Sequence, residues 1–450
     1  MSTTFPDGFS WGVATSAYQI EGGRFQQGKG ESIWDRFADT GRMTDSGDVA
    51  CDHFHRWRGD IALMAELGVT SYRFSTSWTR IVPDGVGKVN QAGLDFYSQL
   101  VDEMLAKGIT PWLTLYHWDL PQDLQDSGGW LNRDTVDAFA RYADVVSEAL
   151  GDRVKNWITQ NEPWVSAHLG HGIGMFAPGI ADFASALLAG HHLLLSHGRA
   201  VPYIRANSAD ARVGIALDCR PSRPGSADQA DIVANRIHDG FRNRWFLDPV
   251  FGRGYPNDTI KVVEDRAIFD GPALPYVRSG DIEEIAAPID FLGLNYYSSV
   301  AIYAGDEDGD DAVLPMGPDQ PEGYTEMGWE ITPEALTRYL EYLNTEYSPN
   351  EIVITENGAS YSDGVDADGS VHDQRRIDYL ASHIRATADA LDSGVPVRGY
   401  FVWSLLDNLE WVAGFSQRFG IVWVDHATGE RIPKDSYRWF QRVIADGLPK

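Results

Sequence analysis

The sequence predicts an α/β protein built as a (β/α)8 TIM barrel. Eight short segments with the composition of buried strands alternate along the chain with segments whose apolar residues recur at helical spacing. Strands that alternate with helices pair in parallel, and eight such units are the number that closes a barrel. The chain has 450 residues, whereas such a barrel needs about 250. We therefore expect the surplus to lie in extended loops at the C-terminal face of the strands.

The predicted elements follow one another in regular order. Strands are expected at residues 9–15, 70–75, 109–116, 154–162, 212–218, 290–297, 351–356 and 397–404. The clearest helical patterns cover residues 57–67, 94–105, 134–150, 181–207 and 373–392. Gly68 stands where the cap of the first of these helices would lie. No segment has the composition of a linker, so we expect a single domain, residues 1–450.

The composition of the chain limits its partners. Acidic residues outnumber basic ones by 65 to 37, and the resulting net charge of −28 repels phosphate backbones and anionic lipid. We therefore expect neither nucleic acid nor membrane as a partner. The chain also has 15 Trp, 19 Tyr and 19 Phe. Aromatic faces stack on sugar rings, although tryptophan is also ordinary core material.

Cysteine usage and hydropathy bear on the cellular compartment. Cys51 and Cys219 form no Cys-x-x-Cys pair, so neither a disulfide framework nor a zinc ribbon is expected. No stretch reaches the roughly 18 apolar residues of a membrane span. The first eight residues contain neither a basic region nor an apolar run. From these features we expect a cytoplasmic protein.

Two groups of side chains with metal-binding chemistry are expected to be structural. The acidic run at residues 306–311 is typical of a solvated loop tip. Closely spaced histidines have no carboxylate or cysteine near enough in sequence to complete a site; they are His53, His55, His191, His192 and His197. We therefore expect no metal.

Two glutamates stand at the ends of predicted strands. Glu356 follows Ile352–Ile354, three β-branched residues typical of a strand covered on both faces. Glu162 is followed by Pro163, which removes a backbone donor and ends the strand there. Each glutamate alone is more simply a salt-bridged residue at a strand end. Together they match the two carboxylates of glycoside hydrolysis, in which one acts as acid and the other as nucleophile or base.

Polar residues also follow several other predicted strands. The site of a (β/α)8 barrel lies at the C-terminal ends of its strands. We therefore expect these residues to converge with the two glutamates on one mouth; they are Gln19, His117, Asn161, Asn295 and Tyr297.

Motifs in a fixed order cover nearly the whole chain. They are Phe9–Gly22, Tyr72–Ser75, Tyr116–Pro121, Asn161–Trp164, Asn295–Tyr297, Ile354–Gly358, Trp403–Asn408 and Glu410–Trp411. With these motifs the chain resembles glycoside hydrolase family one, the β-glucosidase family.

The resemblance implies a retaining, exo-acting β-glucosidase with Glu162 as acid/base and Glu356 as nucleophile. Arg73 and Tyr297 match groups that hydrogen-bond the nucleophile. The implied substrates are small β-glycosides or short oligosaccharides with a terminal, non-reducing β-D-glucosyl residue, with β-galactosides and β-fucosides as further substrates. No metal and no cofactor are implied.

The resemblance also implies a set of sugar-binding residues. Trp403 matches the stacking floor under the ring, and Phe419 matches the rim of the pocket. Trp164 and Trp329 match positions that flank the aglycone. The remaining positions match groups around the sugar hydroxyls, and they are Gln19, His117, Trp118, Asn161, Asn295, Glu410 and Trp411.

The chain departs from the family pattern in two places. Gln160 stands where relatives often have an apolar residue, and Ala413 stands where many relatives have a second glutamate near the sugar's sixth position. A 6-phospho-β-glycosidase is one alternative. In the segment 410–419, however, Trp411 stands in place of the serine and Phe419 in place of the tyrosine of phosphate-specific relatives, and their lysine is absent. The one cation of this segment, Arg418, is expected to face outward. The other alternative is a catalytically silent sugar-binding barrel, which the intact glutamates argue against.

Overall fold

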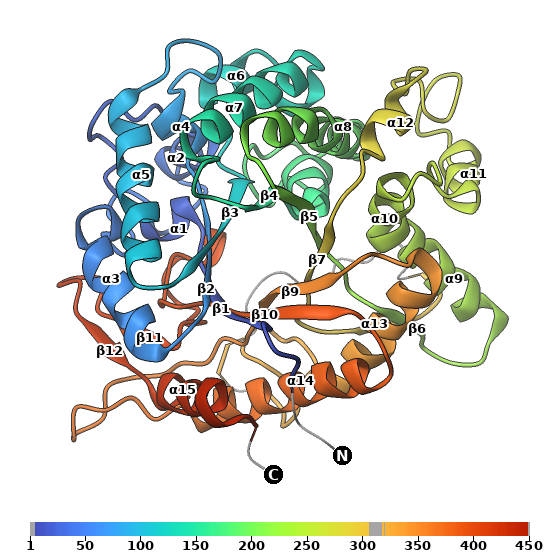
Figure 1. The fold of residues 1–450 in the computed structure, drawn as a ribbon. Coiled ribbons are helices and arrows are strands. Elements are labelled where there is room, and N and C mark those ends of the chain that lie inside the picture. Colours follow the sequence, from blue (N-terminus) through green and yellow to red (C-terminus); the bar gives the residue numbers. More distant parts are fainter. Residues whose placement is uncertain (1–4, 306–316, 319, 449–450) are drawn as a thin grey trace.

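The predicted barrel is confirmed by the computed structural model, which describes residues 5–305, 317–318 and 320–448 (Figure 1). The barrel strands are β1 (Ser10–Ala14), β2 (Ser71–Ser75), β3 (Thr110–Tyr116), β4 (Asn156–Asn161), β5 (Arg212–Asp218), β7 (Phe291–Asn295), β9 (Ile352–Asn357) and β10 (Val397–Trp403). They close in the order β1-β10-β9-β7-β5-β4-β3-β2, and every neighbouring pair is parallel. The acidic run at 306–311, expected to be a solvated loop tip, lies outside the described residues.

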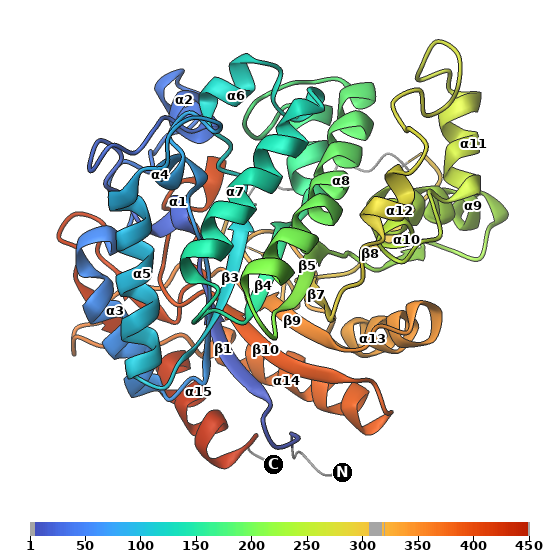
Figure 2. The ribbon, with the colours of Figure 1, turned by 45° about the horizontal axis from the view of Figure 1, so that its top comes forward.

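Helices surround the barrel in both ribbon views (Figures 1 and 2). The α-helices are α1 (Ala17–Ile20), α2 (Ile33–Asp39), α3 (His53–Leu67), α4 (Trp78–Ile81), α5 (Gln91–Ala106), α6 (Gln122–Asp126), α7 (Asp134–Leu150), α8 (Phe183–Asn207), α9 (Gln229–Asp239), α10 (Trp245–Val250), α11 (Asn257–Asp265), α12 (Asp281–Ile285), α13 (Pro333–Tyr347), α14 (Gln374–Asp392) and α15 (Asp435–Asp446). Short helices of other pitch are η1 (Gly129–Leu131), η2 (Val165–Gly172), η3 (Gly240–Arg244) and η4 (Trp411–Ala413). The five predicted helices correspond to α3, α5, α7, α8 and α14. Gly68 caps α3 with a φ of 85°, as expected.

Several short elements were not predicted. β6 (Ser222–Pro224) pairs in parallel with β8 (Val300–Ile302), and β11 (Val422–Val424) pairs with antiparallel β12 (Arg431–Pro433). Strands of three residues are too short to show a period of two, so the sequence gives no signal for them. The long connection between β5 and β7 holds β6 and α9–α12. These helices gather at one side of the barrel (Figures 1 and 2). Part of the surplus chain therefore lies in this connection, which starts at the C-terminal end of β5.

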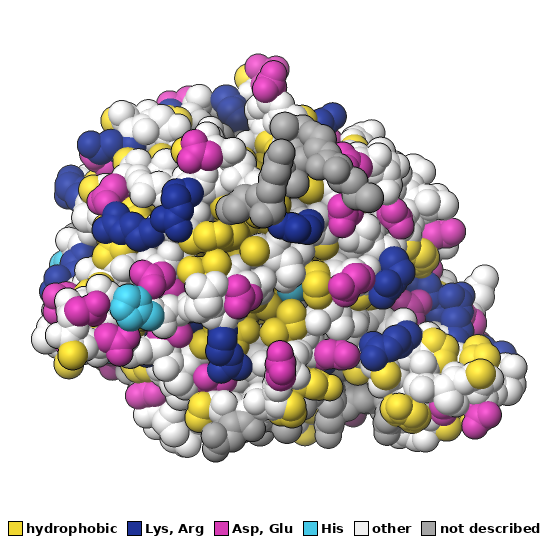
Figure 3. Space-filling view, turned by 90° about the horizontal axis from the view of Figure 1, so that it is seen from below, with side chains coloured by type: hydrophobic (Ala, Val, Ile, Leu, Met, Phe, Trp, Pro, Cys, Tyr) yellow, Lys and Arg dark blue, Asp and Glu magenta, His cyan; other side chains and the backbone are white. Residues whose placement is uncertain are grey.

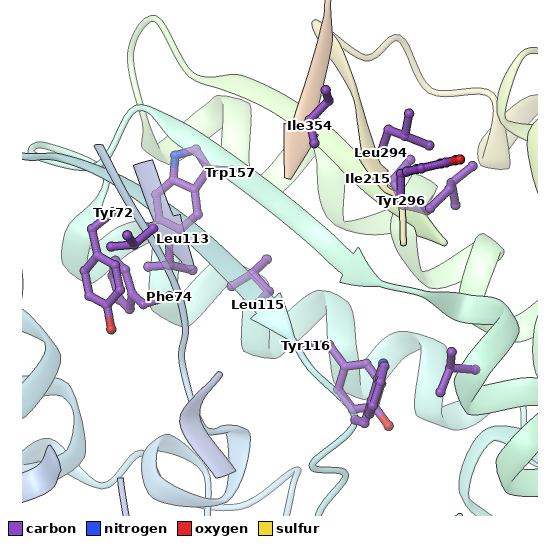
Figure 4. Packing of buried hydrophobic residues seen from close by; sticks show 14 of the residues in the cluster. Tyr72, Phe74, Leu113, Leu115, Tyr116, Trp157, Ile215, Leu294, Tyr296 and Ile354 are labelled. Carbon is purple, nitrogen blue, oxygen red and sulfur yellow. The ribbon is translucent and has the colours of Figure 1, made fainter. Parts of the chain in front are cut away.

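Side chains alternate between two apolar layers along each strand. On β3, Trp112 belongs to the cluster inside the barrel, whereas Leu113 belongs to the cluster between strands and helices. On β4, Ile158 and Trp157 divide in the same way. Figure 4 shows members of the outer cluster, including Leu113 and Trp157. Because both faces of each strand are covered, a strand such as β9 can begin with the consecutive apolar residues Ile352–Ile354 instead of alternating with polar ones.

The surface carries charges of both signs. On the face shown in Figure 3, acidic and basic side chains are interspersed, and hydrophobic side chains gather near its middle. The net negative charge of the chain therefore does not form a patch of one sign on this face. Among the helices of the described residues, none combines the length and the apolar character needed to cross a membrane.

Gly12 on β1 tests how tightly the barrel interior is packed. It lies beside Phe401 of β10, and a Cβ at Gly12 would stand 2.3 Å from that ring. We expect Gly12→Ala to lower the free energy of unfolding by about 1–3 kcal/mol, because an overpacked core must shift. The measurement is the midpoint of urea or thermal unfolding.

Gly59 provides the matched control. It is exposed on α3, and a Cβ there meets nothing within 4 Å. Gly59→Ala is therefore expected to raise stability by about 0.5–1 kcal/mol through helix propensity. An unchanged unfolding midpoint for Gly12→Ala would show that Phe401 moves aside without cost.

Candidate active site

A cavity of about 920 Å³, which includes space open to solvent, lies at the C-terminal ends of the barrel strands. Most of the predicted site residues line its wall, namely His117, Trp118, Glu162, Trp164, Tyr297, Trp329, Glu356, Trp403, Glu410, Trp411 and Phe419. The other four lie behind the wall. Arg73 contacts Glu356, Asn161 contacts His117, Asn295 contacts Glu162, and Gln19 contacts Glu410. The fold thus brings all fifteen predicted residues together.

Glu356, near the end of β9, is held by a cation and a phenol. Its Oε1 accepts a hydrogen bond from Arg73 Nη1 at 2.5 Å, and its Oε2 accepts one from the Tyr297 hydroxyl at 2.6 Å. Arg73 and Glu356 are both buried, so this is an ion pair away from water. Burial raises the pKa of Glu356, while the charge of Arg73 and the two hydrogen bonds oppose that rise. These contacts favour the ionised form of Glu356.

Glu162, just beyond β4, has a different environment. Its backbone is in the left-handed region with a φ of 48°, and its N–H donates to Ala216 O on β5 at 2.9 Å. Its Oε1 accepts from Asn295 Nδ2 at 2.5 Å. Burial raises the pKa of Glu162 well above its usual range, and the negative charges of Asp218 and Glu356 raise it further. Burial therefore raises the pKa of both carboxyl groups, but less at Glu356, where Arg73 and Tyr297 oppose the rise.

Amide and imidazole groups connect the two glutamates. Asn161 Oδ1 accepts from Arg73 Nη2 at 2.6 Å and from Asn295 Nδ2 at 3.0 Å. Asn161 Nδ2 lies 3.1 Å from His117 Nε2. Burial and the charge of Arg73 hold the pKa of His117 well below its usual value, so the ring is neutral. Nε2 then accepts from Asn161, and the proton of His117 resides on Nδ1.

Aromatic rings form one wall of the cavity. The rings of His117 and Trp403 are nearly parallel, with centroids 5.8 Å apart and an interplanar angle of 15°. Trp118 packs on Trp411 at 4.5 Å. The indole N–H of Trp118 donates to Asn161 O at 2.9 Å, so it is already used within the protein. Trp118 therefore contributes its ring face to the cavity.

Further aromatic rings also line the cavity. The ring of Trp329 is 5.3 Å from that of Tyr297 and 6.2 Å from that of Phe419. Trp164 stacks on His168 at 5.2 Å with an interplanar angle of 17°. Trp164 and Trp329 thus add flat apolar surfaces to the cavity wall.

Glu410 provides a further carboxyl group on the wall. Gln19 Nε2 donates to Glu410 Oε2 at 3.5 Å and to Leu409 O at 2.8 Å. Burial, together with the charge of Glu356, raises the pKa of Glu410 to about 8. Ala413 also lines the cavity and adds no polar side chain where many relatives have a glutamate.

Two residues singled out in the sequence, Arg418 and Gln160, donate hydrogen bonds to groups that do not line the cavity. Arg418 Nη1 donates to Asp407 Oδ2 at 2.8 Å and to Val424 O at 3.1 Å, and its guanidinium lies over Trp423. Gln160 is fully buried, and its Nε2 donates to Ser196 Oγ of α8 at 2.8 Å. Among the described residues, no group of three or more His, Cys, Asp or Glu is arranged to hold a metal ion.

Part of the cavity wall was not predicted from the sequence. Asp218, Cys219, Arg220 and Arg242 also line the cavity. Asp218 is the last residue of β5, so the rule that selected other strand-end polar residues would have selected it too. Arg242 lies on η3, a short π-helix for which the sequence provides no signal.

Comparison with known proteins agrees with this geometry. A profile of "Glycosyl hydrolase family 1" matches residues 1–447. The chain is 49% identical to beta-glucosidase A of Thermotoga maritima over 98% of this chain and 97% of that protein. It is 47% identical to a 1,4-beta-D-glucan glucohydrolase of Thermotoga neapolitana over 98% of both chains. A solved structure of the Thermotoga maritima beta-glucosidase in complex with glucoimidazole superposes with a TM-score of 0.92, 48% identity and full coverage of both chains.

The barrel, its paired carboxylates and these similarities define a glycoside hydrolase. The chain belongs to glycosyl hydrolase family 1, as the sequence motifs predicted.

Tyr297→Phe tests the support of Glu356. The substitution removes the hydrogen bond to Oε2 and leaves the ring in place. Because that bond lowers the pKa of Glu356, its loss should raise the pKa. The acidic limb of kcat/KM for an aryl β-glucoside should then move by about one unit toward higher pH.

Tyr296→Phe is the neighbouring control. Its hydroxyl donates to Thr332 O at 2.7 Å, away from the glutamates. Its acidic limb should stay at the wild-type position. Equal shifts in both variants would mean that the contact between Tyr297 and Glu356 does not set this limb.

Proposed function

We propose that the protein is a retaining, exo-acting β-glucosidase in which Glu162 donates the proton and Glu356 is the nucleophile. The observation that carries these roles is the unequal environment of the two carboxyl groups. Glu356 has a cation and a phenol as partners, whereas Glu162 has the amide of Asn295 and two negative neighbours. An ionised group beside a protonated one is what double displacement requires at its start.

The reaction proceeds in two displacements. In the first, the Glu356 carboxylate bonds to the anomeric carbon, the bond to the leaving oxygen breaks, and Glu162 gives its proton to that oxygen. In the second, the Glu162 carboxylate takes a proton from water. The water oxygen bonds to the anomeric carbon, and the bond to Glu356 breaks. Two inversions at one carbon return the β configuration.

The change of role at Glu162 follows from electrostatics. When Glu356 is ionised, its charge raises the pKa of Glu162 and favours the acid form. When Glu356 has become a neutral ester, that charge is gone and the pKa of Glu162 falls. Glu162 then suits the role of base in the second displacement.

Neutral sugar hydroxyls suit the polar groups on the wall. The proposed partners are the Nδ1 proton of His117, the side chain of Asn161, and Glu410 with its neighbour Gln19. The indole of Trp403 is the proposed floor under the sugar ring, and Trp411 is a proposed N–H donor. The side of the cavity with Trp164 and Trp329 is proposed for the aglycone.

The proposed substrates are small β-glucosides and short β-linked oligosaccharides, with β-galactosides and β-fucosides as further substrates. The similarity to a protein named for 1,4-β-D-glucan supports the oligosaccharides, and with them a role in cellulose breakdown. We infer that the whole chain acts as one catalytic unit. The cytoplasmic location stays a prediction.

Two alanine variants separate the roles of the glutamates. Glu356→Ala should abolish nearly all hydrolysis, and added azide should restore turnover by forming the α-glycosyl azide, because the small anion attacks from the vacated side. Glu162→Ala should slow phenyl glucoside far more than dinitrophenyl glucoside, because only a poor leaving group needs the proton. Rates on the two substrates and NMR of the product measure both effects. The same response in the two variants would refute the assignment.

A sugar phosphate tests the alternative activity. A dianion in a closed site needs cationic partners. Among the described residues, the cations on the wall are Arg220 and Arg242, and Arg242 is paired with Asp218. We expect kcat/KM for nitrophenyl glucoside to exceed that for its 6-phosphate by at least about a hundredfold, about 2.7 kcal/mol. Comparable rates would favour a 6-phospho-β-glycosidase, and no turnover of either substrate would favour a silent sugar-binding barrel.

A further inference from the structure

An ion pair outside the expected catalytic set lies on the wall beside Glu162. Asp218 ends β5, and Arg242 lies on η3. Arg242 Nη2 donates to Asp218 Oδ2 at 2.6 Å, and Nη1 donates to Asp218 O at 2.7 Å. Arg242 thus binds both the carboxylate and the backbone of one residue. The side chain of Asp218 is 14% exposed and that of Arg242 6%, so little water screens either charge.

The pair is also tied to the segment that contains Glu162. The guanidinium of Arg242 lies 3.7 Å above the ring of Trp164, two residues after Glu162. On the other side, the Glu162 N–H donates to Ala216 O, two residues before Asp218. The ion pair is therefore connected to the Glu162 segment in two places, through Trp164 and through β5. These two connections fix the positions of the Asp218 and Arg242 charges relative to the Glu162 carboxyl group.

The charges near Glu162 come from several elements. The charged or titratable groups that share its cavity wall or contact its partners are Asp218, Cys219, Arg220, Arg242, His117, Tyr297, Glu356, Glu410 and Arg73. Of these, Asp218 acts on the pKa of Glu162 more strongly than Glu356 does, and Arg242 acts in the opposite direction. Arg73 and Tyr297 are bonded to Glu356, so they act mainly on the nucleophile.

We propose that Asp218 and Arg242 form a charge pair that sets the pH range over which Glu162 donates its proton. Asp218 is a positioning residue whose fixed negative charge keeps the proton on Glu162, and Arg242 limits that effect and holds Asp218 in place. The inference rests on the proposed role of Glu162 as the acid.

The charges of Asp218 and of the nucleophile Glu356 last for different parts of the reaction. The charge of Glu356 disappears when the glycosyl ester forms, so its effect on Glu162 is present in only one of the two displacements. The charge of Asp218 persists through both. Asp218 therefore raises the pKa of Glu162 in both displacements, and the effect of Glu356 adds to this in the first. Arg242 keeps the effect of Asp218 small enough for Glu162 to ionise in the second displacement.

Two single substitutions should act in opposite directions. Asp218→Asn keeps the shape and an acceptor for Arg242 but removes the negative charge. The alkaline limb of kcat/KM for phenyl glucoside should move to lower pH by about one unit. Arg242→Gln removes the positive charge and should move the limb to higher pH. The double variant should lie between them, and Arg242→Lys, which keeps the charge, should stay near the wild type.

Two controls show whether the shift of the alkaline limb arises from the effect of Asp218 and Arg242 on Glu162. Arg244 lies on the same η3, is similarly buried, and pairs with Asp239 and Asp258. Arg244→Gln changes the charge by the same amount and should leave the limb in place. With dinitrophenyl glucoside, which needs no proton in the first displacement, the shifts should be absent because the limb no longer reports Glu162.

The outcomes separate this inference from the proposed function. If the wild type hydrolyses phenyl glucoside but the two single variants shift in the same direction, or not at all, the inference is wrong and the function stands. If the wild type hydrolyses no glucoside, the proposed function fails. Carbon-13 titration of the Glu162 carboxyl, assigned with Glu162→Gln, then tests the inference without activity. A lower pKa in Asp218→Asn and a higher one in Arg242→Gln support it, and any other pattern overturns it.

Discussion

The buried ion pair between Arg73 and Glu356 is the contact on which the arrangement of the site depends. Both side chains are almost fully buried, and an unpaired charge in such a place costs several kcal/mol. Arg73 also donates to Asn161 Oδ1 and Thr355 O. One guanidinium from β2 therefore fixes groups on β4 and β9, on different sides of the barrel. Asn161 and Thr355 are thus positioned by the same guanidinium that pairs with Glu356.

The second property of the site is a graded distribution of charge. The negative charge of Glu356 is compensated by direct contacts with the cation of Arg73 and the phenol of Tyr297. Around Glu162 the nearest polar partner is neutral, and negative charges stand nearby. A barrel makes this difference possible because the C-terminal ends of all its strands lie at the same face, so groups from different strands can be combined in one site. The pKa of Glu162 is thus raised more strongly than that of Glu356, although both residues lie at strand ends.

Much of the fold and of the site could be predicted from the sequence because each depends on local patterns. The run Ile352–Ile354 predicted a strand covered on both faces, and β9 is such a strand. The polar residues that follow strands were predicted to converge, and the cavity brings them together. The three-residue strands β6 and β8 had no such pattern. Asp218 was visible at the end of a predicted strand, but alone it was indistinguishable from an ordinary acidic residue.

The sequence by itself determined the barrel and the family and singled out the two glutamates, because strand composition and motif order can be read along the chain. Only the tertiary structure decided which charges act on each glutamate. Asp218 and Arg242 are 24 positions apart, and both lie far along the chain from Glu162. The size of an electrostatic effect depends on separation in space and on burial. Those two quantities exist only once the barrel has closed and η3 has packed against Trp164.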